Sequence, residues 1–215
     1  MAAPGDAGAA VGTLDELRQA EAACRRCPLY RDATQVVPGE GAIGARLLLV
    51  GEQPGDREDL TGKPFVGPAG RILDRALGDA GIAREQVFVT NAVKHFKHEK
   101  RGKRRLHKRP NADEIERCRW WLDLELELVK PATVIAMGAT AARSLLGRPV
   151  TIAEARGQAH ALADGTPLRV TVHPSLLLRL RDEADKEREY RRFVADLSAA
   201  DAGSRDAASG SRRRD

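Results

Sequence analysis

Aromatic residues, cysteines and long apolar runs are all scarce in this sequence of 215 residues. Only 4% of the residues are Phe, Trp or Tyr, which argues against an extended surface on which the bases of a single strand stack. The apolar runs reach only the length of a strand, so a membrane-spanning helix is excluded. The N-terminus lacks a basic start followed by an apolar stretch. We therefore expect a cytoplasmic protein without a secretory signal.

The three cysteines are Cys24, Cys27 and Cys118. Cytoplasmic thiols stay reduced, so these residues indicate metal binding or burial rather than disulfides. A lone Cys-x-x-Cys with one distant cysteine is only moderately specific. A pair near a helix end and one buried thiol on a helix would explain it equally simply.

Positive charge is concentrated in one segment. The chain holds 36 Lys and Arg against 31 Asp and Glu, for a net charge of +5. Residues 94–109, KHFKHEKRGKRRLHKR, contain nine Lys or Arg and only one acid, Glu99. We expect a long exposed loop that either binds a polyanion or is spread out by its own repulsion. A solvated disordered insert and a localisation signal are the alternatives.

Strand-like apolar segments alternate with helical ones along the chain. We expect strands at residues 46–51, 87–91, 133–138 and 168–172, and helices at residues 13–26, 69–80, 111–129, 139–146 and 184–197. This alternation predicts an α/β fold, a three-layer α/β/α sandwich with a central four-stranded parallel sheet. One domain then covers residues 13–197. Residues 1–12 and 198–215 are expected to be disordered tails, since their Ala, Gly, Ser and charged residues bury too little surface.

Polar residues follow three of the expected strands, where parallel sheets bind their ligands. Glu52 follows the first strand, Asn91 ends the second and His173 follows the last. Glu52 begins a segment, residues 51–70, with five glycines and three prolines. It matches neither a Walker loop nor a dinucleotide fingerprint, and a structural turn would explain it equally well. A carboxylate beside a basic loop nevertheless suggests chemistry on nucleic acid.

Several motifs occur together in one order: GE-x-PG at 51–55, TG-x-PFVG-x-AG at 61–70, TN at 90–91 and HPS at 173–175. In this the chain resembles the iron–sulfur uracil-DNA glycosylases of family four, from about residue 24 to residue 193. Gln53 and KRRLH at 103–107 resemble the UdgX branch in particular. Members of that branch remove uracil from DNA and stay covalently attached to the resulting deoxyribose through the histidine of this loop. Leu176 departs from the branch pattern, where a second Ser is common.

The resemblance implies a role for five residues. Phe65 would stack on a uracil flipped out of the DNA, and Asn91 would hydrogen-bond its amide edge. His173 would contact the uracil carbonyl or a nearby phosphate. Glu52 would stabilise the oxocarbenium-like sugar. His107, kept neutral by the cations around it, would attack that sugar in place of water; a phosphate contact is the alternative role for His107.

Further contacts are expected around these residues, although an acid in a loop such as Asp59 is more often a cap or part of a solvated turn. Further substrate contacts are expected at Gly51, Gln53, Asp59 and Ser175. Phosphate contacts are expected at Lys94, Arg101, Arg104, Arg105 and Arg179, although solvated surface is an equally good reading of these cations. The partner would be uracil-containing DNA, preferably single-stranded, bound by a monomer.

A 4Fe–4S cluster is implied as well, with Cys24, Cys27 and Cys118 as ligands. His95 stands where most relatives have another cysteine, and imidazole can replace thiolate at such clusters. Zinc held by three cysteines and one histidine is the chemical rival. Two functional alternatives remain open: a glycosylase that turns over with water as the nucleophile, and a non-catalytic iron–sulfur DNA-binding module.

Overall fold

The computed structural model describes residues 11–211, with the side chains of residues 11–205. At its centre is a five-stranded sheet in the order β2-β1-β5-β7-β6. The sheet strands are β1 (Leu47–Gly51), β2 (Val87–Asn91), β5 (Thr133–Met137), β6 (His160–Ala161) and β7 (Pro167–Thr171). The α-helices are α1 (Leu14–Ala22), α2 (Asp56–Thr61), α3 (Pro68–Asp79), α4 (Ala112–Val129), α5 (Ala139–Leu146), α6 (Ile152–Ala155) and α7 (Glu183–Ser211). Short 3₁₀ turns are η1 (Pro28–Arg31), η2 (Arg84–Gln86) and η3 (Pro174–Leu176).

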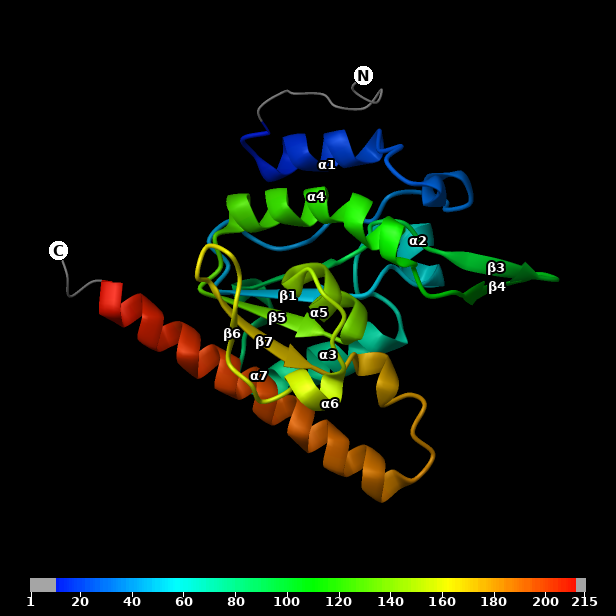
Figure 1. The fold of residues 1–215 in the computed structure, drawn as a ribbon. Coiled ribbons are helices and arrows are strands. Elements are labelled where there is room, and N and C mark those ends of the chain that lie inside the picture. The colour runs from blue at the N-terminus through cyan, green and yellow to red at the C-terminus, as the bar shows by residue number, and fades with distance from the viewer. Residues whose placement is uncertain (1–10, 212–215) are drawn as a thin grey trace.

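The predicted three-layer α/β/α sandwich is confirmed. Strands β1, β2, β5 and β7 run parallel, and the two-residue strand β6 adds an antiparallel edge that was not predicted. Figure 1 shows α1 and α4 on one side of the sheet and α3 and α7 on the other. In the described part of the chain, no helix is both long and apolar enough to span a bilayer.

Alternate residues of each strand enter two separate cores. In β1, Leu47 and Leu49 pack with α3 and α7, whereas Leu48 and Val50 pack with α4 and α5. All five residues of β1 are buried, as expected of a parallel strand that is covered on both faces. The continuous apolar runs in the sequence are therefore explained by this double burial.

Helix α7 continues beyond its predicted end at residue 197. Phe193, Leu197, Ala200 and Ser204 are all buried and recur at helical spacing, so the packed face extends into the small residues that follow Leu197. Arg46 also binds the buried carboxylate of Asp201, with an Nη2–Oδ1 distance of 2.5 Å. The prediction of a disordered tail from residue 198 was wrong for the described residues up to 211. Of the N-terminal tail, residues 1–10 lie outside the described part.

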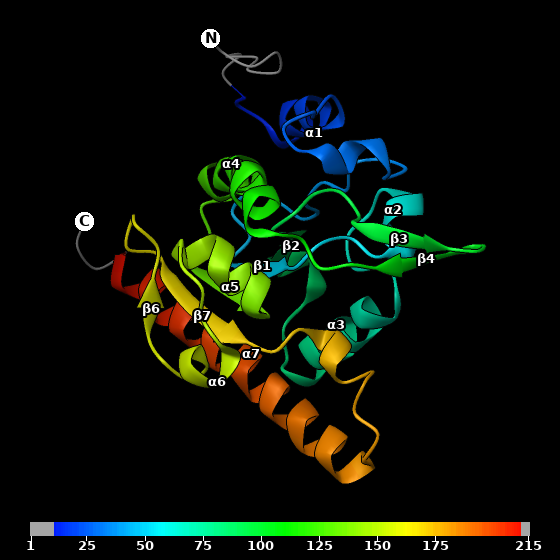
Figure 2. The same ribbon diagram turned by 45° about the vertical axis from the view of Figure 1, so that its right-hand side comes forward.

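Residues 98–107 of the basic segment form a β-hairpin rather than an open loop. Its strands are β3 (His98–Arg101) and β4 (Arg104–His107), which pair antiparallel with His98 opposite His107. The connection has two residues, and Gly102 has a φ of +60°, a conformation that favours glycine at the first position of such a turn. Figure 2 shows the hairpin projecting beyond the sheet beside α2. The repulsion expected to spread this segment is relieved in part by Asp56 and Asp59, which bind Arg105.

Candidate active site at the carboxyl ends of the strands

Three of the predicted site residues meet where β1 and β2 end. Gly51 pairs with Asn91 in the sheet, and a Cβ on Gly51 would lie 2.4 Å from Asn91 Oδ1 and 2.7 Å from Phe65 Cζ. Such distances are far below van der Waals contact, so the absence of a side chain at Gly51 is what allows the amide and the ring to approach. Gly51, Phe65 and Asn91 therefore pack together at the carboxyl end of the sheet, as the floor of the candidate site.

The backbone at Phe65 is strained. Its φ of +57° is in the left-handed region, which a bulky residue adopts only where the surrounding structure enforces it. A Cβ on Gly70 would lie 1.6 Å from the carbonyl oxygen of Phe65, so glycine is required where α3 passes this residue. The Phe65 ring faces the imidazole of His173, with centroids 6.0 Å apart and an interplanar angle of 29°. The strain thus places an aromatic ring beside Asn91 and His173.

His173 has a defined protonation state. The backbone N–H of Ser175 donates to His173 Nδ1 at 3.2 Å, and Ser175 Oγ lies 2.9 Å from the same atom. An Nδ1 that accepts leaves the proton on Nε2. Desolvation lowers the pKa of His173 to about 4, so the ring is neutral near pH 7 and presents one N–H donor. Ser175 thus sets the tautomer of His173, and its predicted contact with substrate stays a prediction.

Glu52 is held as an anion from two sides. Thr140 Oγ1 donates to Oε2 at 2.5 Å, and His107 Nε2 lies 3.2 Å from Oε1. Burial by itself would raise the pKa of Glu52, but the bonds from His107 and Thr140 and the charge of Arg109 hold it below its ordinary value. Thr140 was missed in the sequence. It follows the strand at residues 133–138, and the rule that located Glu52 and His173 would have located it too.

His107 joins this pocket from the hairpin. Its side chain is half exposed, at the open side of the Glu52 carboxylate. The site therefore combines an amide, a neutral N–H donor, an aromatic ring, a carboxylate and an exposed imidazole. This set can bind a planar heterocycle with an amide edge and supply both negative charge and a nucleophile beside it.

Comparison with known proteins agrees with this geometry. Residues 38–198 match the family model described as the uracil DNA glycosylase superfamily. The chain belongs to this superfamily. It is 38% identical over 172 residues to the type-4 uracil-DNA glycosylase of Thermotoga maritima, covering 80% of this chain and 83% of that protein. It is 34% identical over 184 residues to the type-4 enzyme of Pyrobaculum aerophilum, covering 81% and 90%. A type-5 uracil-DNA glycosylase of the same organism is 31% identical over 157 residues, covering 57% and 65%.

Gln53 was predicted to contact substrate. Its side chain instead joins the hairpin to the rest of the α/β domain. Its side chain is only 6% exposed. Nε2 donates to the carbonyl oxygens of Lys97 and Lys108, at 3.1 Å each, and Oε1 accepts from the N–H of Lys97 at 3.1 Å. Lys97 precedes β3 and Lys108 follows β4, so this one amide joins both legs of the hairpin. Gln53 thereby fixes the base of the segment that carries His107.

Arg105 and Asp59 bind each other between α2 and the hairpin. Arg105 donates from Nε to Asp56 at 2.6 Å and from Nη1 to Asp59 at 2.5 Å. Asp59 is fully buried and also accepts from the N–H of Thr34 at 3.0 Å. The predicted substrate contact at Asp59 was therefore wrong, because its carboxylate is buried as the counter-ion of Arg105. The phosphate contact of Arg105 stays a prediction.

Lys94 is another correction. Its side chain is fully buried and its Nζ lies 2.6 Å from Glu125 Oε2, so it cannot reach a phosphate. Arg101, Arg104 and Arg179 are exposed, as a phosphate contact requires, and their roles stay predictions.

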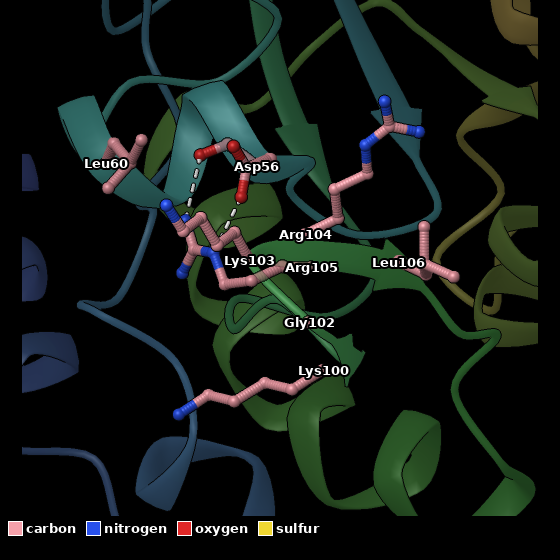
Figure 3. Close-up of a pocket in the computed structure, with 8 residues that line it drawn as sticks. All are labelled: Asp56, Leu60, Lys100, Gly102, Lys103, Arg104, Arg105 and Leu106. Carbon is pink, nitrogen blue, oxygen red and sulfur yellow. Dashed lines mark hydrogen bonds and ion pairs between the residues drawn. The ribbon is translucent and has the colours of Figure 1, made fainter.

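A basic cavity of about 640 Å³ lies between α2 and the hairpin. Figure 3 shows Arg105 turned toward Asp56, whereas Lys100 and Arg104 extend away from it in different directions. Its lining residues are Asp56, Leu60, Lys100, Gly102, Lys103, Arg104, Arg105 and Leu106. Asp56 offsets the charge of Arg105. Lys100, Lys103 and Arg104 therefore leave this surface positive beside the site.

The cysteines lie together on the α1–α4 side of the domain. Cys24, Cys27 and Cys118 are buried in one apolar cluster. Trp121 Nε1 donates to Cys24 Sγ at 3.1 Å, and the N–H of Lys94 donates to Cys118 Sγ at 3.2 Å. Hydrogen bonds to sulfur of this kind stabilise thiolate ligands at iron–sulfur clusters. The donor chemistry thus suits such a cluster.

His95 is buried and directly follows Lys94, whose backbone N–H binds Cys118. Burial together with the positive charge of Arg25 lowers the pKa of His95 to about 4. The ring is therefore neutral, as a metal ligand must be. Among residues 11–205, however, no three Cys, His, Asp or Glu side chains converge closely enough to hold a metal ion. The kinds of ligand fit the group, but the described side chains are not gathered around one point.

Proposed function

We propose that this protein excises uracil from DNA and then remains linked to the abasic deoxyribose through His107. The observation that carries the proposal is the 3.2 Å separation of His107 Nε2 from Glu52 Oε1. It puts a nucleophilic ring beside the carboxylate that would face the sugar, in a member of a superfamily whose type-4 relatives are uracil-DNA glycosylases.

Base recognition would use the pocket floor. A flipped-out uracil would stack on Phe65 and offer its N3–H and O4 to the amide of Asn91. Cytosine carries an amine at that edge and would leave donors facing donors. The N–H of His173 would donate to a uracil carbonyl, and this hydrogen bond would strengthen as negative charge develops on the carbonyl oxygen. The C1′–N1 bond would then break with its electron pair on the departing uracil anion.

Loss of the base leaves an electron-poor C1′. The anionic Glu52 would stabilise this oxocarbenium-like sugar. A lone pair on one ring nitrogen of His107 would form the new bond to C1′, and the proton on the other ring nitrogen would pass to a base such as Glu52. The product is a neutral N-alkyl imidazole. Because it is a poor leaving group, the adduct would persist.

Single-stranded DNA is the proposed substrate form, bound by a monomer. The exposed cations Arg101, Arg104 and Arg179 would contact its phosphates. A flexible single strand avoids the cost of unstacking and unpairing the target base, which a duplex imposes. The cytoplasmic location also stays a prediction.

We also propose that Cys24, Cys27 and Cys118, with His95, hold a 4Fe–4S cluster that ties the N-terminal segment to α4. The cluster would be structural, and no step of the reaction uses it. Iron and sulfide analysis together with a visible absorption spectrum test this, since zinc gives no visible band. Bound zinc without iron would replace the cluster with a Cys3His zinc site.

The test of the reaction is a denaturing gel. Purified protein is mixed with a uracil-containing single-stranded oligonucleotide and heated in detergent before loading. We expect a shifted band that is lost with His107→Ser, with Glu52→Gln and with a thymine oligonucleotide. Strand breaks after alkali without a shifted band would mean that water is the nucleophile. Neither signal would leave a binding module, which would hold uracil-free DNA equally well.

A further inference from the structure

Lys94 is the largest charged side chain fully enclosed in the described part of the protein. Its ammonium donates to Thr90 Oγ1 at 2.5 Å, to the carbonyl oxygen of Asn91 at 3.0 Å and to Glu125 Oε2 at 2.6 Å. All three donors of the ammonium are thus used. Two of the three acceptors belong to the end of β2, which carries the base-reading amide.

Glu125 completes the arrangement from α4. Its Oε1 accepts from the hydroxyl of Thr90 at 3.0 Å and from the N–H of Gly39 at 3.0 Å. Its other oxygen binds Lys94. Thr90 therefore accepts a hydrogen bond from Lys94 and donates one to Glu125. The Lys94–Glu125 pair thus holds the side chain of the residue just before Asn91. The strand end is fixed on its inner side by charged hydrogen bonds, which are stronger than neutral ones.

We propose that the buried Lys94–Glu125 pair positions Asn91 and thereby sets the selectivity of the site for the amide edge of uracil. This inference rests on the proposed excision of uracil. Asn91 is held at its carbonyl by Lys94, and its side-chain oxygen lies close against Gly51, where a Cβ would be only 2.4 Å away. The bond from Lys94 fixes the backbone from which the amide projects, so its loss would let the backbone and the amide shift away from the base.

A purely structural role for the pair predicts different behaviour. Removing Lys94 alone leaves a buried, uncompensated carboxylate and destabilises the protein whatever else the pair does. Removing both charges relieves that penalty but does not restore a donor to the carbonyl of Asn91. The doubly neutral variant therefore separates positioning from folding. Only the side chain of Lys94 is changed, so its backbone N–H bond to Cys118 is kept.

The experiment compares single-turnover uracil excision by the parent protein, by Lys94→Met with Glu125→Gln, by Asn91→Ala, and by the triple variant. Gln at position 125 keeps an oxygen for Thr90 and Gly39. We expect the doubly neutral variant to melt near the parent temperature yet to excise uracil about 10- to 100-fold more slowly, as small misplacements of a recognition group do. In the Asn91→Ala background the same two changes should cost less than about twofold, because residues that act through each other are not additive.

A matched control removes another buried cation. Arg156 binds Asp196 at 2.8 Å and also Glu189, between α6 and α7. Arg156→Met should lower the melting temperature and leave excision unchanged. Parental excision by the doubly neutral variant would overturn the inference, as would losses that multiply in the triple variant. If the parent itself excises no uracil, the proposed function fails instead.

Discussion

Replacing Gln53 with Ala tests whether the position of His107 decides between adduct formation and hydrolysis. The substitution removes an amide that makes hydrogen bonds of 3.1 Å to the backbone of Lys97 and Lys108. His107 directly precedes Lys108, so the loss falls on the leg of the hairpin that bears the imidazole. Asn91, Phe65 and their contacts are not altered.

The expected magnitude follows from these bonds. Three hydrogen bonds contribute roughly 1 kcal/mol each, and part of this is regained because water can reach the freed carbonyls. About 2 kcal/mol of restraint on the hairpin base is therefore lost. A nucleophilic side chain that is fixed beside the reacting carbon attacks faster than water because of such restraint. We expect uracil excision to stay within about threefold of the parent, while the ratio of adduct to free abasic product falls by about 10-fold or more.

The assay counts both products from one reaction, by the shifted band in a detergent gel and by strand breaks after alkali. Gln35→Ala is the matched control, since Gln35 Nε2 also donates to two carbonyls, those of Asp59 and Leu60, at 3.1 and 3.0 Å. It should lower stability and leave the product ratio unchanged. If Gln53→Ala keeps the parental ratio, or slows excision as much as adduct formation, the hairpin base does not control the nucleophile.

Three further outcomes are expected. Gly51→Ala should slow single-turnover excision at least about 100-fold, because the new methyl group displaces Asn91; near-parental rates would mean that the pocket floor can shift. Arg105→Ala should lower the free energy of unfolding in urea by about 3 kcal/mol, because Asp59 is left buried and unpaired; an unchanged denaturation midpoint would contradict this. Burial and the nearby Glu125 carboxylate raise the pKa of Glu21 to about 8. Between pH values of about 4.5 and 8, Glu21 is therefore protonated in the folded protein and ionised in the unfolded chain. The free energy of unfolding consequently falls as pH rises through this range. Glu21→Gln should therefore gain stability relative to the parent across that range, measured by denaturation at several pH values, and a constant difference would refute it.

The layers of the fold were predictable because the spacing of apolar residues along the chain matches the residues that are buried. Strand β1 is apolar throughout, and the helices on both faces leave no other arrangement for it. The starts of α1 at Thr13 and of α4 at Asn111 were predicted correctly, because the capping boxes found there are local signals. The end of α7 was not predictable in this way. Ala200 and Ser204 are buried there because they are small, and they give no large apolar side chain to mark the packed face.

The site was predictable where a residue follows a strand and not where a residue acts through another. Glu52, Asn91 and His173 stand at strand ends, so the topology alone brings them together. The inward direction of Gln53 has no such signature. Whether its amide faces substrate or backbone depends on where the hairpin returns, and that contact links residues 44 and 55 positions apart.

Lys94 was misjudged because charge was counted along the chain instead of being matched across it. The correcting signal lies on α4. Cys118, Trp121, Leu122 and Val129 recur at helical spacing on its buried face, and Glu125 stands among them. An acid in the middle of an apolar helix face must either keep its proton, as Glu21 does, or bind a buried cation, since an ionised carboxylate is not buried alone. A lysine three residues after the strand end can supply it, with an ammonium that then binds the carbonyl of Asn91. Burial and function thus select the same residue, and the basic segment begins inside the protein rather than on its surface.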